Sequence, residues 1–346
     1  ADSLQLLHQT GNGLTPMEGL RLTFVNVGYG EAMVLECPDP SFPGSTFVMV
    51  IDGGSGEAGE YQTSDTGRIP LGAYLARHGV DHIDAMAVTH IHEDHLCGLL
   101  PVVEHLTPRA FWQTLPGDFW KHMRPLTIPT AGQAISRRKF LQALNDYQII
   151  CRRLKTEECC KRTLAAGVVL NPCKDLTIRV LGPSTIRAKH LEKLCRELYQ
   201  ETEEIAFWRR LDQLDDVMNI CSLILRIEYR GVRLLLPGDT NYMGYGDLTG
   251  EDLRADLFKV GHHGQQDGIS RNQIQQIAPK AVVCCGSSDR RYNSAEPGIL
   301  QMMADSGATL YFSDCPPKPD GTTPPSHQAL VFTVDVDGTL HGSYLP

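Results

Sequence analysis

The side chains of this protein that could do chemistry are concentrated in the segment HIHEDH, residues 90–95. His90 and His92 are two positions apart, so at the end of a strand their imidazoles point to the same side. If a turn then starts a helix near Asp94, Asp94 and His95 face a second point close by. Imidazole and carboxylate groups at two neighbouring points are typical of a two-metal hydrolytic site. The alternative is a polar loop with solvated histidines, but such a loop seldom gathers this many metal ligands.

The apolar run at residues 83–88 predicts a short buried strand that ends just before these ligands. An apolar strand followed by His-x-His-x-Asp-His resembles the metallo-β-lactamase superfamily. The resemblance implies an α/β fold, a four-layer αββα sandwich with a dinuclear metal centre at one edge. It covers about residues 20–107 and 175–340.

A second candidate ligand lies at the end of the segment 219–239. This segment is predicted to be a hairpin with its turn at Arg230-Gly231, and it ends in Gly-Asp. In the superfamily, a carboxylate in this position bridges the two metals, which implies that role for Asp239. The alternative is an ordinary turn aspartate after Pro-Gly.

The segment LFKVGHHG, residues 257–264, again predicts a buried strand that delivers histidines at its end. It resembles one branch of the superfamily, the hydrolase domain of the DNA-uptake channel protein ComEC and its stand-alone relatives. Either histidine could be the ligand. In related motifs the first histidine binds the metal, so we expect His262 to be a ligand and His263 to be a catalytic residue that faces the substrate. An earlier strand ends in Asp52, and the same branch implies a structural role for that residue beneath the site.

Many members of the superfamily have a further histidine about twenty residues before the bridging aspartate, whereas this chain has Asn219 and Ser222 there. The ComEC-type branch shares this feature. We therefore expect these two residues to contact the substrate. A site with fewer imidazoles would suit Mn²⁺, or a weakly held Zn²⁺, better than two tightly bound zinc ions.

The predicted chemistry is hydrolysis by a hydroxide that bridges two divalent metal ions. The ions would lower the pKa of a bound water towards about 7. Asp94 could serve both as a ligand and as the acceptor of the nucleophile's proton, and His263 could protonate the leaving group. His327, which precedes the last predicted strand, could reach the same substrate, but the favoured alternative is a surface histidine.

The composition fits a globular protein of 346 residues, with 42% apolar and 21% charged residues and a net charge of −9. No apolar run approaches the roughly 18 residues that a membrane span requires, and the first twenty residues do not resemble a signal peptide. Eleven scattered cysteines favour reduced thiols over a disulfide framework. We therefore expect a single cytoplasmic domain over residues 1–346 that does not enter a membrane.

The charge is unevenly distributed along the chain. Residues 109–162 hold eleven Lys and Arg against four Asp and Glu, an excess of +7, so the rest of the chain carries −16. The surrounding segment, about residues 108–170, fits the common core poorly and predicts a helical, basic insertion with a helix over residues 137–153. If the insertion overhangs the metal centre, Arg137 and Arg138 could bind substrate phosphate. The alternative is an ordinary solvated helical face.

These features favour a metal-dependent phosphodiesterase or nuclease with a phosphate-containing substrate such as a nucleotide or nucleic acid. The acidic net charge favours a different reading, a hydrolase of a small ester, lactone or lactam. A third alternative is a catalytically silent metal-binding protein, against which the full ligand set argues. Nothing in the sequence predicts the oligomeric state.

Overall fold

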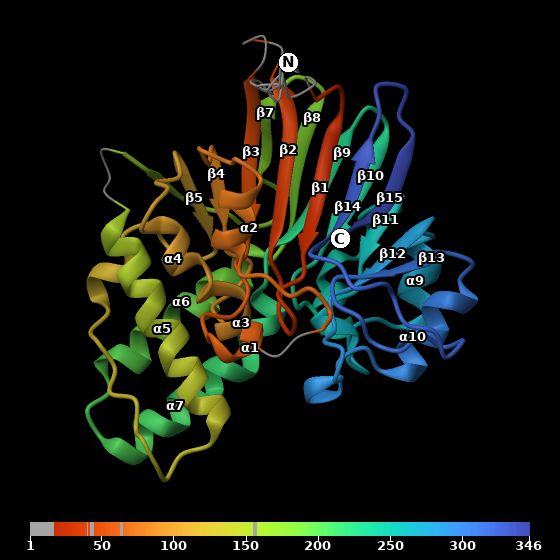
Figure 1. The fold of residues 1–346 in the computed structure, drawn as a ribbon. Coiled ribbons are helices and arrows are strands. Elements are labelled where there is room, and N and C mark those ends of the chain that lie inside the picture. The colour runs from red at the N-terminus through yellow and green to blue at the C-terminus, as the bar shows by residue number, and fades with distance from the viewer. Residues whose placement is uncertain (1–16, 40, 42–44, 63–64, 155–157) are drawn as a thin grey trace, which may run out of the picture.

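The computed structural model describes residues 17–39, 41, 45–62, 65–154 and 158–346. Within this part of the chain the strands form two sheets that lie face to face (Figure 1). One sheet has eight strands in the order β15-β14-β1-β2-β3-β4-β5-β6, and the other has seven in the order β13-β12-β11-β10-β9-β8-β7.

The strands are β1 Leu20–Val25, β2 Met33–Asp39, β3 Ser45–Ile51, β4 Ala85–Ala87, β5 Ala110–Gln113, β6 Cys160–Thr163, β7 Val169–Cys173, β8 Leu176–Gly182, β9 Ile224–Tyr229, β10 Val232–Leu236, β11 Leu257–Lys259, β12 Ala281–Cys284, β13 Thr309–Phe312, β14 Ala329–Val334 and β15 Leu340–Leu345. The α-helices are α1 Gly59–Gln62, α2 Leu71–Arg77, α3 Glu93–Leu96, α4 Leu99–Val103, α5 Ile135–Arg153, α6 Thr185–Gln200, α7 Glu204–Met218, α8 Tyr242–Tyr245, α9 Arg271–Ile277 and α10 Pro297–Asp305. Short 3₁₀ helices include η2 Asn219–Cys221, η4 His262–Gly264 and η5 Arg291–Asn293.

The space between the two sheets is filled by side chains that alternate along each strand. In β1, Leu22 and Phe24 are buried against the opposite sheet, while Val25 packs in the layer outside its own sheet. In β9, Ile227 faces the inter-sheet core and Ile224 the outer layer. This alternation follows from the period of two in an extended chain. Each strand can therefore bury one face between the sheets and the other beneath helices.

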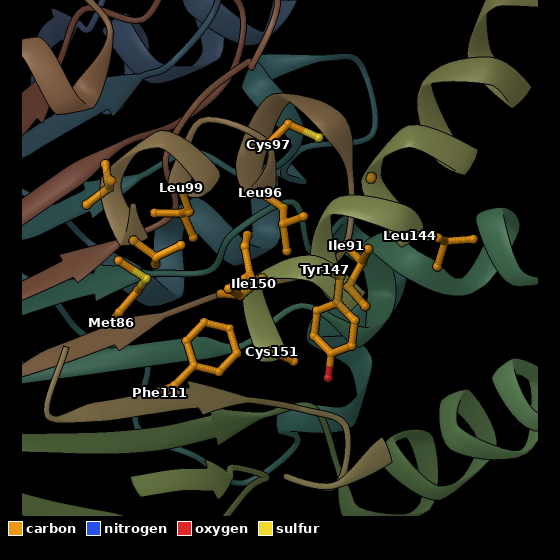
Figure 2. Close-up of a cluster of buried hydrophobic side chains, with 14 of the residues drawn as sticks. Met86, Ile91, Leu96, Cys97, Leu99, Phe111, Leu144, Tyr147, Ile150 and Cys151 are labelled. Atoms are coloured by element: carbon orange, nitrogen blue, oxygen red, sulfur yellow. The ribbon is translucent and has the colours of Figure 1, made fainter. Parts of the chain in front are cut away.

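Helices cover the outer face of each sheet (Figure 1). Over the eight-stranded sheet, α5 packs onto strand residues such as Phe111 through side chains that include Tyr147 and Ile150 (Figure 2). Over the seven-stranded sheet, α9 and α10 contribute residues such as Ile274 and Leu300. The predicted four-layer αββα sandwich is therefore confirmed. No helix among the described residues is both long and apolar enough to cross a bilayer.

The segment predicted as an insertion, residues 108–170, is only partly outside the sheets. Strands β5 and β6 pair in parallel and extend the eight-stranded sheet, and β7 forms an edge of the other sheet. Along the chain, the long helix α5 comes after β5 and before β6. Its bounds agree with the helix expected at residues 137–153. The helices α6 and α7 follow β8 along the chain. Both helices bury apolar residues against the core around α5.

Candidate metal centre

The carboxyl ends of three strands meet at one edge of the sandwich. β4 leads into the 90–95 segment, β10 leads to Asp239, and β11 leads to His263. Because β10 and β11 are parallel neighbours, their carboxyl ends lie side by side. A close approach of the β1–β2 loop completes the edge. A Cβ at Gly30 would collide with the backbone carbonyl of Asp94, so this position requires glycine.

One carboxylate oxygen of Asp239 lies at the middle of the cluster. Its Oδ2 is 3.0 Å from His263 Nε2, 3.2 Å from His95 Nε2 and 3.8 Å from His90 Nε2. His90 Nε2 is in turn 3.0 Å from His92 Nδ1. Asp239 Oδ2 therefore lies near the imidazoles of His90, His95 and His263, and His92 joins the cluster through His90.

Asp94 also belongs to this cluster. Its Oδ2 lies 3.0 Å from His263 Nε2 and 3.6 Å from His95 Nε2, and these two nitrogens are 3.2 Å apart. The structure thus brings together five residues that the sequence predicts as ligands, namely His90, His92, Asp94, His95 and Asp239. Their imidazole and carboxylate donors are suited to Zn²⁺ and Mn²⁺, so the residues present fit divalent metal ions.

Asp52 orients two of the imidazoles from beneath. His95 Nδ1 donates a hydrogen bond to Asp52 Oδ2 at 2.7 Å. The Thr89 hydroxyl also donates to Asp52 Oδ2, at 2.5 Å, and lies 3.0 Å from His90 Nδ1. Such partners fix the tautomer and leave the opposite ring nitrogen as a lone-pair donor. These contacts agree with the structural role expected for Asp52.

The other two imidazoles have partners of their own. His263 Nδ1 donates to the backbone carbonyl of Cys285 at 3.0 Å. His92 Nε2 is 2.8 Å from Asp215 Oδ1 on α7. The sequence analysis missed Asp215, because nothing in the local pattern of α7 distinguishes it from the other acidic residues of that helix. Each imidazole thus has one nitrogen in the cluster and one in a fixed hydrogen bond.

The electrostatics of the cluster favour a positive charge at its centre. Burial alone would lower the pKa of His95, but the carboxylates of Asp239 and Asp94 raise this pKa well above its usual value. Burial alone would raise the pKa of Asp239, but the imidazoles of His263 and His95 hold it well below its usual range. By contrast, burial and the neighbouring imidazoles lower the pKa of His90 well below its usual value.

The positions of the two adjacent histidines are the reverse of those expected from the sequence. His263 is fully buried and has its Nε2 in the cluster, whereas the His262 side chain is 18% exposed and lies outside it. His262 Nδ1 is 2.7 Å from Asp267 Oδ1, and its Nε2 is 3.2 Å from Asn219 Nδ2. Both histidines have positive φ, 46° and 53°, so the chain turns tightly after β11 and swings the second ring inward. A rule based on the first histidine after a strand cannot anticipate this turn.

A buried lysine occupies the other side of Asp239. Lys259 donates to the carbonyl of Gly238 at 2.7 Å, contacts the carboxylate of Glu31, and lies 3.7 Å from Asp239 Oδ1. Among the described residues, Glu31 belongs with His95, Asp239 and His263 to a group whose ligand atoms lie within 4.8 Å of one another. Its pairing with Lys259 makes it a less available ligand than Asp94. The charged residue inside the apolar run LFKV was the sequence signal for this pair.

A cavity of about 260 Å³ opens onto the cluster. Asn219 lines it, as expected for a substrate contact. Ser222 does not, because it is buried and its hydroxyl accepts a hydrogen bond from the backbone N–H of Asp239 at 3.2 Å. His327 is also remote from the cavity. It is buried, with ring nitrogens 2.6 Å and 2.9 Å from the carbonyls of Pro325 and Ser313, so both the substrate-contact and the surface expectations for His327 are wrong.

The arginines expected to bind phosphate also lie elsewhere. Arg137 makes a two-pronged contact with Asp212 on α7, at 2.8 and 2.6 Å. Arg138 lines a neighbouring cavity of about 610 Å³ rather than the one at the cluster. The next residue, Lys139, lines both cavities. The helix therefore does overhang the site, but one position further along than expected, since Arg137 is turned towards α7.

Comparisons with known proteins agree with this architecture. Residues 28–154 match the family model of the metallo-beta-lactamase superfamily. ComE operon protein 3 of Bacillus subtilis (strain 168) is 24% identical over 233 residues, which cover 66% of this chain and 23% of that protein. The chain thus matches less than a quarter of the length of that relative.

Two solved structures have a similar course of the chain. Zinc-bound PqqB from Methylobacterium extorquens is 11% identical with a TM-score of 0.42, covering 84% of this chain and 97% of that chain. Human tRNase Z, short form, is 12% identical with a TM-score of 0.35, covering 76% and 91%. Likeness at this level says nothing about activity. Residues 28–154 thus match the metallo-beta-lactamase superfamily model, and the two-sheet fold of the described residues is consistent with that match.

Proposed function

We propose that this protein is a metal-dependent hydrolase that binds two divalent ions, Zn²⁺ or Mn²⁺. One ion would be held by His90 and His92, the other by Asp94, His95 and His263, with Asp239 shared between them. The observation that carries the proposal is the position of Asp239 Oδ2, which lies within 3.8 Å of imidazoles from both groups. When bound, such a pair of ions activates water near neutral pH and stabilises charge that develops on the substrate.

We propose a phosphodiester as the substrate, because α5 brings a positive charge to the cavity. Lys139 lines the cavity together with Asp94 and Asp239. Its ammonium group is 3.2 Å from Glu57, which lines the neighbouring cavity, and 3.7 Å from Glu93, which lines both cavities. An ammonium group there would bind a phosphate oxygen of the substrate. The resemblance of residues 257–264 to the ComEC-type branch supports the same choice.

The remaining polar residues of the cavity would position the substrate. Asp94 lines the cavity as well as the cluster, and is placed to accept a proton from the attacking nucleophile. His262 takes over the substrate-facing role first expected of His263. Its Nδ1 donates to Asp267, so its Nε2, beside the amide nitrogen of Asn219, would accept a hydrogen bond from the substrate.

A second candidate is hydrolysis of a small uncharged ester, lactone or lactam. One observation favours it. The carboxylates of Glu93, Asp94, Asp215 and Asp239 all line the cavity, against the single lysine Lys139 among its lining residues. Carboxylates that bound metals do not neutralise would repel an anionic substrate.

The two candidates are separated by turnover of the metal-loaded protein with bis-p-nitrophenyl phosphate, a β-lactam and a lactone. The proposal predicts hydrolysis of the phosphodiester and its loss in Asp239→Asn, a nearly isosteric change that removes the shared charge. Hydrolysis of the lactone or lactam alone would favour the second candidate. Turnover of none of the three, with metals bound, would favour a silent metal-binding protein.

A further inference from the structure

One large aromatic side chain at the mouth of the cavity is left exposed. Tyr292 lines the cavity beside the metal centre, yet 50% of its surface is open to solvent. It packs edge-on against Tyr29, with ring centroids 5.0 Å apart and an interplanar angle of 64°. Tyr29 in turn lies 4.6 Å from the ring of His263. A row of three rings thus runs from the metal centre to solvent.

The backbone that presents Tyr292 adopts a costly conformation. Arg290, Tyr292 and Asn293 have φ of 51°, 54° and 60°, in the left-handed region that side chains with a Cβ rarely occupy. Such conformations persist where the surroundings impose them, and they cluster at ligand-binding sites. Here Ser288 N donates to Asp314 Oδ2 at 2.8 Å, which ties the start of the loop to the body of the protein.

A single buried carboxylate holds both tyrosine-bearing loops. Glu60 Oε1 accepts a hydrogen bond from the backbone N–H of Tyr29 at 3.0 Å, and its Oε2 accepts from Arg291 Nη1 at 2.5 Å. Arg68 braces the same carboxylate at 2.8 Å and contacts Asp314 at 2.8 Å. Glu60 therefore ties together the two backbone segments that carry Tyr29 and Tyr292.

The same cavity also holds a positive charge. Lys139 and Phe140 of α5 line it together with Tyr29 and Tyr292. The cavity thus offers an ammonium group for a phosphate and an exposed aromatic ring for a planar group. A phosphodiester with a planar aromatic group close to the phosphate, as in a nucleotide, matches both features.

We propose that Tyr292, braced by Tyr29, stacks a nucleobase of the substrate, so that the substrate is a nucleotide or a single-stranded nucleic acid. This inference rests on the proposed phosphodiesterase function and names its substrate class. A stacking ring tolerates every base, because each base has a π face. The subsite therefore selects for the presence of a base and not for its identity.

The test is equilibrium binding of two matched ligands to the metal-loaded protein by calorimetry. Thymidine 5′-monophosphate carries a base, and 2-deoxyribose 5-phosphate is the same molecule without one. The wild type should bind the nucleotide at least about fivefold more tightly, the lower end of the range for stacking one base on an aromatic side chain. Tyr292→Leu should remove this preference, and Tyr292→Phe should retain it.

Tyr242→Leu is the matched control, because Tyr242 is 48% exposed on α8 and does not line the cavity. It should leave the preference unchanged. Equal affinities for the two ligands, binding of neither, or a preference that survives Tyr292→Leu would each overturn the subsite. Base-dependent binding that Tyr292→Leu removes, in a protein that hydrolyses no phosphodiester, would support the subsite and count against the proposed function alone.

Discussion

The two carboxylate oxygens of Asp239 face different partners. Oδ2 points to the imidazoles, whereas Oδ1 lies 3.7 Å from the buried ammonium group of Lys259. Lys259 is itself fixed by the carbonyl of Gly238 and by Glu31. Because a cation already attends Oδ1, the arrangement leaves one oxygen of Asp239 for both proposed metal ions.

Because His262 and His263 have different surroundings, we expect their alanine variants to differ in metal content and turnover. His263→Ala should lower the metal content of the purified protein, because the buried Nε2 of His263 lies among the proposed ligands. His262→Ala should retain the metals and lower turnover, because His262 lines the cavity. Elemental analysis beside turnover checks both. Full metal content in His263→Ala, with loss in His262→Ala, would restore the assignment expected from the sequence.

Asp215 is expected to act on the metal through His92. Asp215→Asn keeps the size of the side chain but weakens the 2.8 Å contact that orients the ring. Loss of such a partner typically costs about 10- to 100-fold in metal affinity, and the weakened ion should be the one held by His90 and His92. Titration against a competing chelator measures this change.

Asp212→Asn is the matched control, since Asp212 lies on the same helix and pairs with Arg137. Its metal affinity should equal that of the wild type. A similar loss in both variants would mean that the effect arises from the packing of α7 and not from His92.

The helices and strands differ in how they bring residues to the site, and this difference separates the predicted site residues from those that were missed. His90 to His95 follow one strand directly, so their spacing reveals their chemistry. Asp215 and Lys139 come from helices α7 and α5, far along the chain. Their positions depend on how these helices pack over the eight-stranded sheet. A single sequence contains no local pattern for that packing.

The position of α5 predicts which of its basic residues binds phosphate. Lys139→Met should raise KM for a phosphodiester about tenfold, the lower end of the range for a hydrogen bond to a charged group. KM for an uncharged ester should change little. The increase should shrink in high salt, which screens exposed charges over about 10 Å at 0.1 M.

Arg137→Met serves as the comparison because Arg137 pairs with Asp212 and does not line the cavity. It should lower stability slightly without changing the ratio of the two KM values. An equal effect of Arg137→Met on the phosphodiester would show that the general charge of α5, and not Lys139, attracts the substrate.

Across the whole chain, folding pairs part of the basic excess of residues 109–162 with carboxylates. Arg109 contacts Asp84, Arg137 contacts Asp212 and Arg153 contacts Glu104, at 3.1 Å or less. These acidic partners lie outside the segment. A count of charges along the sequence therefore overstates the positive charge that the substrate would meet, because folding brings in the compensating carboxylates.

The sandwich itself could be predicted because its causes are local. Alternating apolar residues in β1 and β9 specify two-faced strands, and the His-x-His-x-Asp-His segment places the candidate centre at a strand end. Two of the residues that were predicted wrongly have a common cause. His327 and Ser222 were expected at the substrate, but both are buried in hydrogen bonds to distant parts of the chain. Which polar residue faces a cavity is decided by tertiary contacts.

Whether the cluster binds two metal ions can be measured by a metal titration. Metal-depleted protein is titrated with Zn²⁺ or Mn²⁺ while bound metal and hydrolysis of bis-p-nitrophenyl phosphate are recorded together. Our account predicts that two ions bind per chain and that activity is complete only when both are bound, whereas Asp239→Asn fails to bind the pair. Full activity with one ion per chain, or hydrolysis by the metal-free protein, would contradict it.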